Sequence, residues 1–387
     1  MSEETTSPTG TYRSLTAGGE TVRAFIPDPL PPELELGSAD YDLMERANRA
    51  LGRLDGISTL LPDRELFLYL YVRKEAVLSS QIEGTQSSLS DLLLFEDDRT
   101  PGVPLDDVRE VSNYVAALNH GLERLRSGFP LSLRLIREIH GVLLQDGRGA
   151  DKTPGEFRRS QVWLGGSRPG TARFVPPPVS EVMVCLDRFE HYLYEPGTPV
   201  LIKAALAHVQ FETIHPFLDG NGRVGRLLIT FLLCAEDVLA EPLLYLSLYF
   251  KTRRDEYYER LQRVRTHGEW EAWLRFFLRG VQETSKQAVD TARDILALFE
   301  RDRARIREGT GGAASSTLRV HEVLQRQPLL TIKEAARRSS LSQPTARVAL
   351  DHMARLGITR EVTGGSYRMT YLYSPYLAIL ERGTEPL

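Results

Sequence analysis

A short run between His215 and Arg226 concentrates the residue types that phosphate chemistry needs. It reads HPFLDGNGRVGR. Gly220–Gly222, with an asparagine between two glycines, lets the backbone turn successive N–H groups inward as an anion nest. A helix that starts there points its positive N-terminal end at the same place, and Arg223 and Arg226, three residues apart, can reach toward the same side. The run therefore predicts a site for bound phosphates.

Two further side chains of the run could supply catalysis. Asp219, directly before the nest, is placed to hold Mg²⁺ against phosphate oxygens, because Mg²⁺ prefers one or two carboxylates plus substrate phosphates. The unperturbed pKa of histidine is about 6.5, so a neutral His215 imidazole could take a proton from a hydroxyl that attacks phosphorus. Taken singly, a histidine at a helix end or a Gly-Asn-Gly turn is more often structural. The ordered combination carries the prediction.

The elements that must position this run are mostly helices. Apolar residues recur at helical spacing, with Pro and Gly clusters between the segments. The expected helices cover residues 39–61, 64–83, 106–126, 131–146, 179–194, 199–214, 222–238, 253–266 and 269–307. One island differs: in Gln161–Val175, QVWL and ARFV flank the turn-rich GGSRPGT, which predicts a β-hairpin. The expected fold is mainly α, a helical bundle with one hairpin.

Composition divides the chain into five parts. Residues 1–20 are rich in Ser, Thr and Gly and read as a flexible tail. An N-terminal helical region follows over 21–104, entered through the extended stretch Pro27–Pro32, and a catalytic core over 105–308. Residues 309–316, GTGGAASS, read as a flexible linker to a last domain at 317–387.

That last domain has the pattern of a winged helix. One helix covers about 317–327, a second is opened by the capping box Thr331-Ile-Lys-Glu334, and a third is opened by Ser342 and closed at Gly357. Two short β-patterns follow, at 358–363 and 367–373. Three helices and a β-wing predict a winged helix-turn-helix domain.

Bulk composition restricts the class of protein. The chain is 42% hydrophobic and 26% charged, and its net charge of −4 indicates no strongly polyanionic partner for the whole molecule. Residues 313–387 nevertheless carry ten Lys plus Arg against six Asp plus Glu, a surplus of four positive charges. Cys185 and Cys234 form no CxxC pair, the start has no signal-peptide pattern, and the most apolar run, Leu227–Leu239, is too short to span a bilayer. We expect a cytoplasmic protein without a membrane partner.

The run from His215 matches the motif HxFx(D/E)GNGRxxR at every defined position, so the chain resembles the Fic family. The resemblance covers nearly the whole chain and implies the Fic fold. It also implies transfer of AMP from ATP to a Ser, Thr or Tyr hydroxyl of a target protein or of the chain itself, with Mg²⁺ as cofactor. The relatives that phosphorylate instead depart from the GNGR segment, which is intact here. By this resemblance His215 is the base and Asp219 the Mg²⁺ ligand. The nucleotide contacts are assigned to Gly220, Asn221, Gly222, Arg223, Arg226, Tyr257 and Arg265.

Upstream, the segment from Ser79 to Gly84 resembles the family's inhibitory pattern (S/T)xxxE(G/N), with Glu83 as its acid. A carboxylate paired with Arg226 would occupy the cation that should hold the γ-phosphate and would put negative charge where phosphate must go. The alternative is a surface glutamate at a helix end. Some relatives use this glutamate to activate water, so removal of AMP is a second expected direction.

The predicted hairpin corresponds in position to the Fic flap, which pairs with an extended segment of the target. Val162, Trp163 and Phe174 are the candidate docking residues, although hairpin aromatics are as often packed across the strands. His208 and His215 are seven residues apart and share a helix face, but no third ligand accompanies them, so His208 is better interpreted as a packed core histidine than as a metal ligand.

The rival function is a DNA-binding transcriptional regulator in which the Fic core has a sensing role. The third helix of the winged-helix domain would then enter a major groove. The candidate DNA contacts of this helix are Gln343, Thr345, Arg347 and Arg355, and Arg360 or Arg368 could contact DNA from near the wing. Winged helices also serve in docking and dimerisation, so this alternative stays open, and a homodimer is expected.

Overall fold

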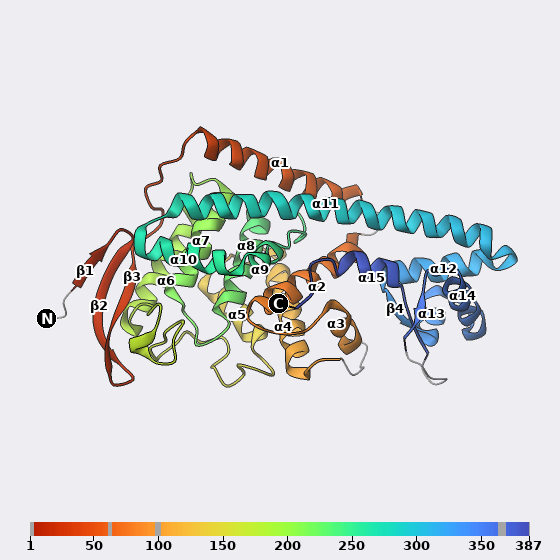
Figure 1. The fold of residues 1–387 in the computed structure, drawn as a ribbon, viewed down its shortest axis with the longest axis horizontal. Coiled ribbons are helices and arrows are strands. Elements are labelled where there is room, and N and C mark those ends of the chain that lie inside the picture. The colour runs from red at the N-terminus through yellow and green to blue at the C-terminus, as the bar shows by residue number, and fades with distance from the viewer. Residues whose placement is uncertain (1–3, 61–63, 97–101, 363–368, 387) are drawn as a thin grey trace.

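The computed structural model of the protein describes residues 4–60, 64–96, 102–362 and 369–386, and helices dominate this part of the chain (Figure 1). A small antiparallel sheet comes first, followed by helices that lead into the core. Their bounds are β1 Glu4–Ser7, β2 Gly10–Ala17, β3 Glu20–Pro27, α1 Ser38–Leu60, α2 Arg64–Ile82 and α3 Leu89–Glu96.

The core is a helical bundle around α7. From Leu201 to Ile214 every residue of this helix is buried, because α6, α8, α10 and α11 contact it from different sides. An apolar sequence on all faces is what a central helix requires. The core elements are α4 Leu105–Arg126, α5 Leu133–Leu143, η1 Pro169–Thr171, α6 Val179–Tyr194, α7 Val200–Ile214, α8 Asn221–Ala235, α9 Ser247–Thr252 and α10 Arg254–His267. The bundle and its helices were predicted, apart from α3 and α9.

One long helix, α11 (Trp270–Gly309), joins the core to the C-terminal domain. It has 40 residues and is therefore roughly 60 Å long at 1.5 Å per residue. Figure 1 shows it running beside α1 along the body and then continuing outward to the C-terminal domain. Helices in the described ranges include none that is both long and apolar enough to span a membrane.

The predicted flexible linker at 309–316 is wrong. α11 extends to Gly309, the 3₁₀ turn η2 covers Gly311–Ala313, and α12 begins at Ala314. Side-chain hydroxyls bond back to the preceding helical turn, from Thr310 to the Ile306 carbonyl at 2.6 Å, and Leu356 packs against Gly309. Packing and capping thus order a segment whose composition alone indicates flexibility.

The C-terminal domain has the three expected helices and a small three-stranded sheet. Its elements are α12 Ala314–Arg326, β4 Leu329–Thr331, α13 Ile332–Ser339, α14 Gln343–Arg355, β5 Arg360–Glu361, β6 Thr370–Leu372 and α15 Ser374–Leu380. The strand order is β4-β6-β5, all antiparallel. The capping box between Thr331 and Glu334 forms as predicted, and Ser342 caps α14. The sequence interpretation missed β4 and α15.

The predicted flexible tail at 1–20 is also wrong over its described residues. β1, β2 and β3 form an antiparallel sheet, with β2 and β3 paired from Gly10–Pro27 to Ala17–Glu20. Alternate residues of β3, Val22 and Ala24, are buried in a small apolar cluster. The Thr9 hydroxyl donates to carbonyl groups near the end of α10. Tertiary contacts therefore order this N-terminal segment, although it contains few apolar residues.

The predicted β-hairpin at Gln161–Val175, which we call the flap, is reduced to a single bridge between Leu164 and Phe174. Three glycines lie between the bridged residues, the third of them within the turn η1, and the bridge is not extended into a ladder. The flap instead joins the N-terminal sheet, because the Phe25 N–H donates to the Val175 carbonyl at 2.9 Å.

Packing of α4 on α8 gives a stability prediction. A β-carbon at Gly121 would lie 2.3 Å from Cζ of the buried Phe231 ring. We expect Gly121→Ala to lower the free energy of unfolding by about 1–3 kcal/mol in urea denaturation, because overpacking outweighs the better helix propensity of alanine. The matched control is Gly52→Ala on the exposed face of α1, where nothing lies within 4 Å. Gly52→Ala should raise the free energy of unfolding by up to about 1 kcal/mol. If Gly121→Ala raised the free energy of unfolding by the same amount, the packing of Gly121 against Phe231 would be contradicted.

Candidate active site

The His215–Arg226 run forms a tight loop between α7 and α8. His215 ends α7 in the left-handed conformation, at φ 49°, and Gly220 precedes α8 at φ 77°. Asn221 closes the loop on itself: its Oδ1 accepts from the Phe217 N–H and its Nδ2 donates to the Phe217 carbonyl, both at 2.9 Å. The backbone is therefore shaped by its own hydrogen bonds before any ligand arrives.

Arg158 holds the same loop from outside. Its Nε donates to the His215 carbonyl at 2.9 Å, its Nη2 to the Pro177 carbonyl at 2.6 Å, and its backbone N–H to the Pro216 carbonyl at 2.8 Å. The side chain is buried, and burial lowers the pKa of its guanidinium to about 10. The buried cation also donates to the Ile214 carbonyl, so it restrains the backbone at the left-handed residue His215.

His140 supports the other half of the loop. Its Nε2 donates to the Asp219 carbonyl at 3.0 Å, its Nδ1 accepts from the Gly155 N–H at 2.8 Å, and its ring stacks on Phe217 with 3.7 Å between centroids. Burial lowers the pKa of His140 to about 4, which keeps the ring in the neutral form that one donated and one accepted bond require. Sequence reasoning missed both His140 and Arg158, because they lie 79 and 57 positions from the groups they hold.

His215 itself is strongly biased toward its neutral form. Burial, followed by the positive charges of Arg265 and Arg158, lowers the pKa of His215 to about 3. Arg265 is buried beside it, with Nε donating to the Thr213 hydroxyl and Nη2 to the Glu212 carbonyl, both at 3.1 Å. A neutral imidazole is the form that can accept a proton.

Glu83 lies directly against the start of α8. Its Oε1 is 2.6 Å from Nη2 of Arg226, whose Nε also donates to the Ser79 hydroxyl at 2.8 Å. A β-carbon at Gly222 would lie only 2.3 Å from the same Oε1, so the carboxylate sits against the glycine of the nest. Glu83 follows the last turn of α2, and Gly84 turns the chain away at φ 102°. The residues of the inhibitory pattern and of the loop are thus brought together.

Arg223 and Asp219 form the second charged pair of the loop. Arg223 Nη1 is 2.8 Å from Glu110 of α4, and its Nη2 is 3.6 Å from Asp219. Oδ1 of Asp219 accepts from the Gly220 N–H at 2.6 Å, while its side chain stays 38% exposed. On its other side Oδ2 lies against Gly149, where a β-carbon would come within 2.8 Å. One partly exposed carboxylate beside a phosphate nest suits Mg²⁺, which takes its other ligands from phosphate and water.

The two residues assigned to the nucleotide outside the loop are both buried. The Tyr257 hydroxyl donates to Nε2 of His208 at 2.8 Å, and Nδ1 of His208 donates to the Gly225 carbonyl at 2.9 Å. His208 is therefore a satisfied core histidine, and no cluster of three metal-ligating side chains occurs in the described ranges. Tyr258, which sequence reasoning missed, is half-buried. Its burial raises the pKa of its hydroxyl most, and the negative charge of nearby Glu83 raises this pKa further.

The flap residues are packed against their surroundings. Phe174 is buried, with the Arg265 guanidinium 4.1 Å above its ring. Trp163 packs on the small cluster formed by β2, β3 and Val175, and Val162 is half-buried. The N-terminal sheet thus supports the flap, and a target could reach only the parts of these side chains that remain exposed.

Two family models match the chain. Residues 41–123 match the Fic/DOC family N-terminal model and residues 130–233 match the Fic/DOC family model. The first range contains Glu83, and the second contains the loop from His215 to Arg226.

Curated relatives bear the same family name. The protein adenylyltransferase Fic of Drosophila virilis is 30% identical over 208 residues, which cover 52% of this chain and 40% of that protein. The protein of the same name from Aedes aegypti is 32% identical over 258 residues, 65% of this chain and 47% of that one. The chain therefore spans less than half the length of these relatives.

A solved structure is similar over most of the chain. The crystal structure of a Fic family protein from Desulfovibrio desulfuricans G20 gives a TM-score of 0.58 at 19% identity, covering 89% of this chain and 98% of that one. At this identity the match shows a common fold.

Support of the loop by Arg158 gives a prediction. We expect Arg158→Met to lower the free energy of unfolding by about 1–3 kcal/mol, because several buried carbonyls lose their donor. Arg159→Met is the control, since the Arg159 side chain is 88% exposed and its ion pair among the described residues is with Glu156, at 3.6 Å. Urea unfolding of both variants measures the difference. Equal stability of the two would show that Arg158 does not hold the loop.

Proposed function

We propose that this chain, which matches the Fic/DOC family models over residues 41–123 and 130–233, is a protein adenylyltransferase. It transfers AMP from ATP to a Ser, Thr or Tyr hydroxyl of a target protein, and to itself, and releases pyrophosphate. The observation that carries the proposal is the preformed loop on which a neutral imidazole, a carboxylate, glycine N–H groups and two guanidinium groups converge. The curated relatives named protein adenylyltransferase support the same activity.

Each group has a chemical task in this proposal. The N–H groups of the nest and the N-terminal end of α8 bind the phosphates, and Arg223 and Arg226 neutralise their charge. Asp219 would hold Mg²⁺, which supplies further positive charge to the phosphate oxygens. His215 takes the proton from the attacking hydroxyl, and the hydroxyl oxygen forms a bond to the α-phosphorus. The bond from that phosphorus to the bridging oxygen breaks, and pyrophosphate leaves with its electron pair.

We further propose that Glu83 inhibits this reaction. Its carboxylate is paired with Arg226 and packed against Gly222, so the γ-phosphate would have to displace it. The displaced interaction is a charge-assisted hydrogen bond to a buried cation, among the stronger contacts that a side chain makes. The Glu83 side chain is 33% exposed, so it can also reach water, which supports removal of AMP as the reverse activity.

The test is Glu83→Gly. Loss of a hydrogen bond to a charged group is worth about 1.5–3 kcal/mol, so the variant should self-AMPylate roughly ten to a hundred times faster than the wild type. Intact-mass analysis after incubation with ATP and Mg²⁺ measures the added AMP. Adding His215→Ala to Glu83→Gly should abolish it. If Glu83→Gly gains no AMP, the proposed activity is wrong; if wild type and variant gain it equally, the inhibitory role is wrong.

A second candidate ligand is DNA, at the C-terminal domain. Gln343, Arg347 and Arg355 of α14 are exposed, as is Arg360 of β5, whereas Thr345 is half-buried. Arg368 lies outside the described residues. Asp351, on the same helix, is 3.9 Å from Arg347 and reduces the positive charge of this face.

Fluorescence anisotropy with duplex DNA at several salt concentrations tests this second function. Each phosphate contact contributes about 0.9 to the slope of log affinity against log salt, so replacing Arg347 and Arg355 by alanine should reduce that slope by about two. Lys286→Ala, on the core part of α11, is the control and should leave it unchanged. Binding that is absent, or insensitive to salt, would favour a docking domain.

A further inference from the structure

The last described residues of the chain, Glu381–Pro386, lie across α2, the helix that ends at Ile82 directly before Glu83. We call them the C-terminal strap. Lys74 of α2 donates from Nζ to the Arg382 carbonyl at 2.9 Å, and Gln81 donates from Nε2 to the Thr384 carbonyl at 2.8 Å. Gln81 stands two residues before Glu83 and also donates to the Ser87 carbonyl, at 2.9 Å, on the far side of the turn. The strap therefore contacts α2 at its middle and at its last turn.

Neighbouring elements hold the strap in the same place. Lys251 of α9 donates from Nζ to the Gly383 carbonyl at 3.2 Å and also to the Glu385 carbonyl. Ser90 of α3 bonds to the Glu381 carboxylate. Figure 1 shows the end of the chain returning from α15 to lie beside α2 in the middle of the molecule. Four carbonyls in succession, from Arg382 to Glu385, thus accept from buried donors.

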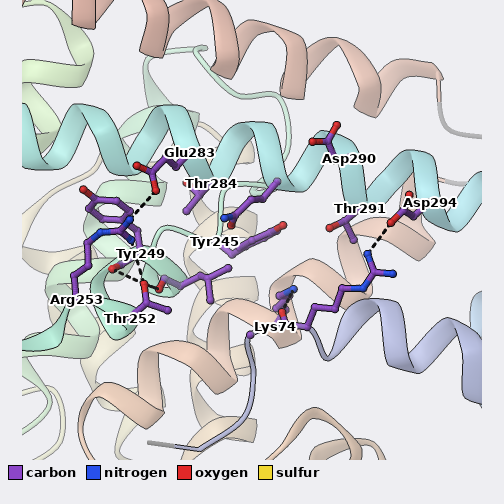
Figure 2. A pocket seen from close by; sticks show the side chains of 14 residues that line it. Lys74, Tyr245, Tyr249, Thr252, Arg253, Glu283, Thr284, Asp290, Thr291 and Asp294 are labelled. Carbon is purple, nitrogen blue, oxygen red and sulfur yellow. Dashed lines mark hydrogen bonds and ion pairs between the residues drawn. The ribbon is translucent and has the colours of Figure 1, made fainter.

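Little apolar burial adds to this attachment. Thr384 is the one buried residue of the strap, at 2% exposure, and the others are half-buried or exposed. Arg382 and Gly383 instead form one wall of a cavity of about 420 Å³ under α11. Figure 2 shows Lys74 and Tyr245 at this cavity, with Thr291 and Asp294 of α11 opposite, and Arg382 pairs with Asp294 at 2.7 Å. A segment held by polar contacts beside a cavity opens at lower cost than a packed one.

The strap is also tied to the C-terminal domain. It follows α15 directly, and the Tyr373 N–H before α15 donates to the Pro328 carbonyl beside β4 at 2.7 Å. The rings of Tyr373 and Tyr376 pack on Phe299 of α11. A displacement of the domain or of α15 would therefore move the strap, and with it the Thr384 carbonyl that accepts from Gln81.

We propose that the C-terminal strap is a regulatory element that keeps the last turn of α2 closed on Arg226, so that its displacement through the C-terminal domain releases Glu83. The inference rests on the proposed function, because it concerns regulation of that same site. A partner that binds the domain more tightly when the strap is displaced would shift the population toward the active state.

Two variants that lie outside α2 and the active site weaken the strap. Lys251→Met removes the ammonium donor and keeps most of the aliphatic side chain. Gly383→Val places a β-carbon 2.7 Å from Leu248 at a backbone φ of +81°, which branched residues rarely adopt. The matched control is Lys286→Met, an exposed lysine of α11 that makes no contact with the strap among the described residues.

Self-AMPylation by intact mass is the readout, with Glu83→Gly measured beside it. Loss of a charge-assisted hydrogen bond should raise the rate of Lys251→Met roughly tenfold, and Gly383→Val should act in the same direction. Lys286→Met should match the wild type. In the Glu83→Gly background neither strap variant should add a further rise, because the carboxylate that the strap controls is gone. Full labelling of these double variants also shows that they fold.

The outcomes separate the two proposals. An inactive Glu83→Gly protein overturns the proposed function. An active Glu83→Gly protein with strap variants at the wild-type rate, or with the same rise in both backgrounds, overturns the strap proposal alone. Hydrogen exchange gives an independent check: the amides of residues 79–84 should exchange faster in Gly383→Val than in Lys286→Met, and equal exchange would contradict the strap proposal.

Discussion

The ion pair between Arg226 and Glu83 is the contact that links the parts of this molecule. Arg226 is buried at the start of α8, where its charge needs a partner, and Glu83 reaches it from the end of α2. The same carboxylate packs against Gly222, in the first turn of α8. A single group therefore satisfies the buried cation and occupies the place where a phosphate would bind. Whatever moves the end of α2 changes both at once.

Hydrogen bonds within the chain fix the conformation of the loop around this ion pair. Asn221 closes it internally, Arg158 fixes its first half and His140 its second. Such preorganisation matters for phosphoryl chemistry, because catalysis there depends on position and charge more than on covalent steps. The backbone of the loop is therefore ordered by the chain itself, and a phosphate bound there, as proposed, would not need to reshape it.

The regions where sequence reasoning failed are those that depend on distant partners. Residues 4–27 have the composition of a tail, yet they form a sheet because Val175 of the flap and the end of α10 accept and pack against them. Residues 309–316 have the composition of a linker, yet helical capping and Leu356 order them. The flap has the turn signal of a hairpin but forms one bridge, since its second strand also bonds to Phe25. Composition describes a segment in isolation, whereas the conformation of each of these segments depends on contacts with residues far along the chain.

The sequence by itself determined the helical bundle, the capped helices of the C-terminal domain and the content of the His215–Arg226 loop. These depend on local periodicity, on caps and on glycine backbone freedom, which act over a few residues. Only the tertiary structure decided that Arg158 and His140 hold the loop, that Arg265 and burial keep His215 neutral, and that the C-terminal strap lies on α2. Hydrogen bonds and charges between segments dozens to hundreds of residues apart arise from packing, which no short-range pattern encodes.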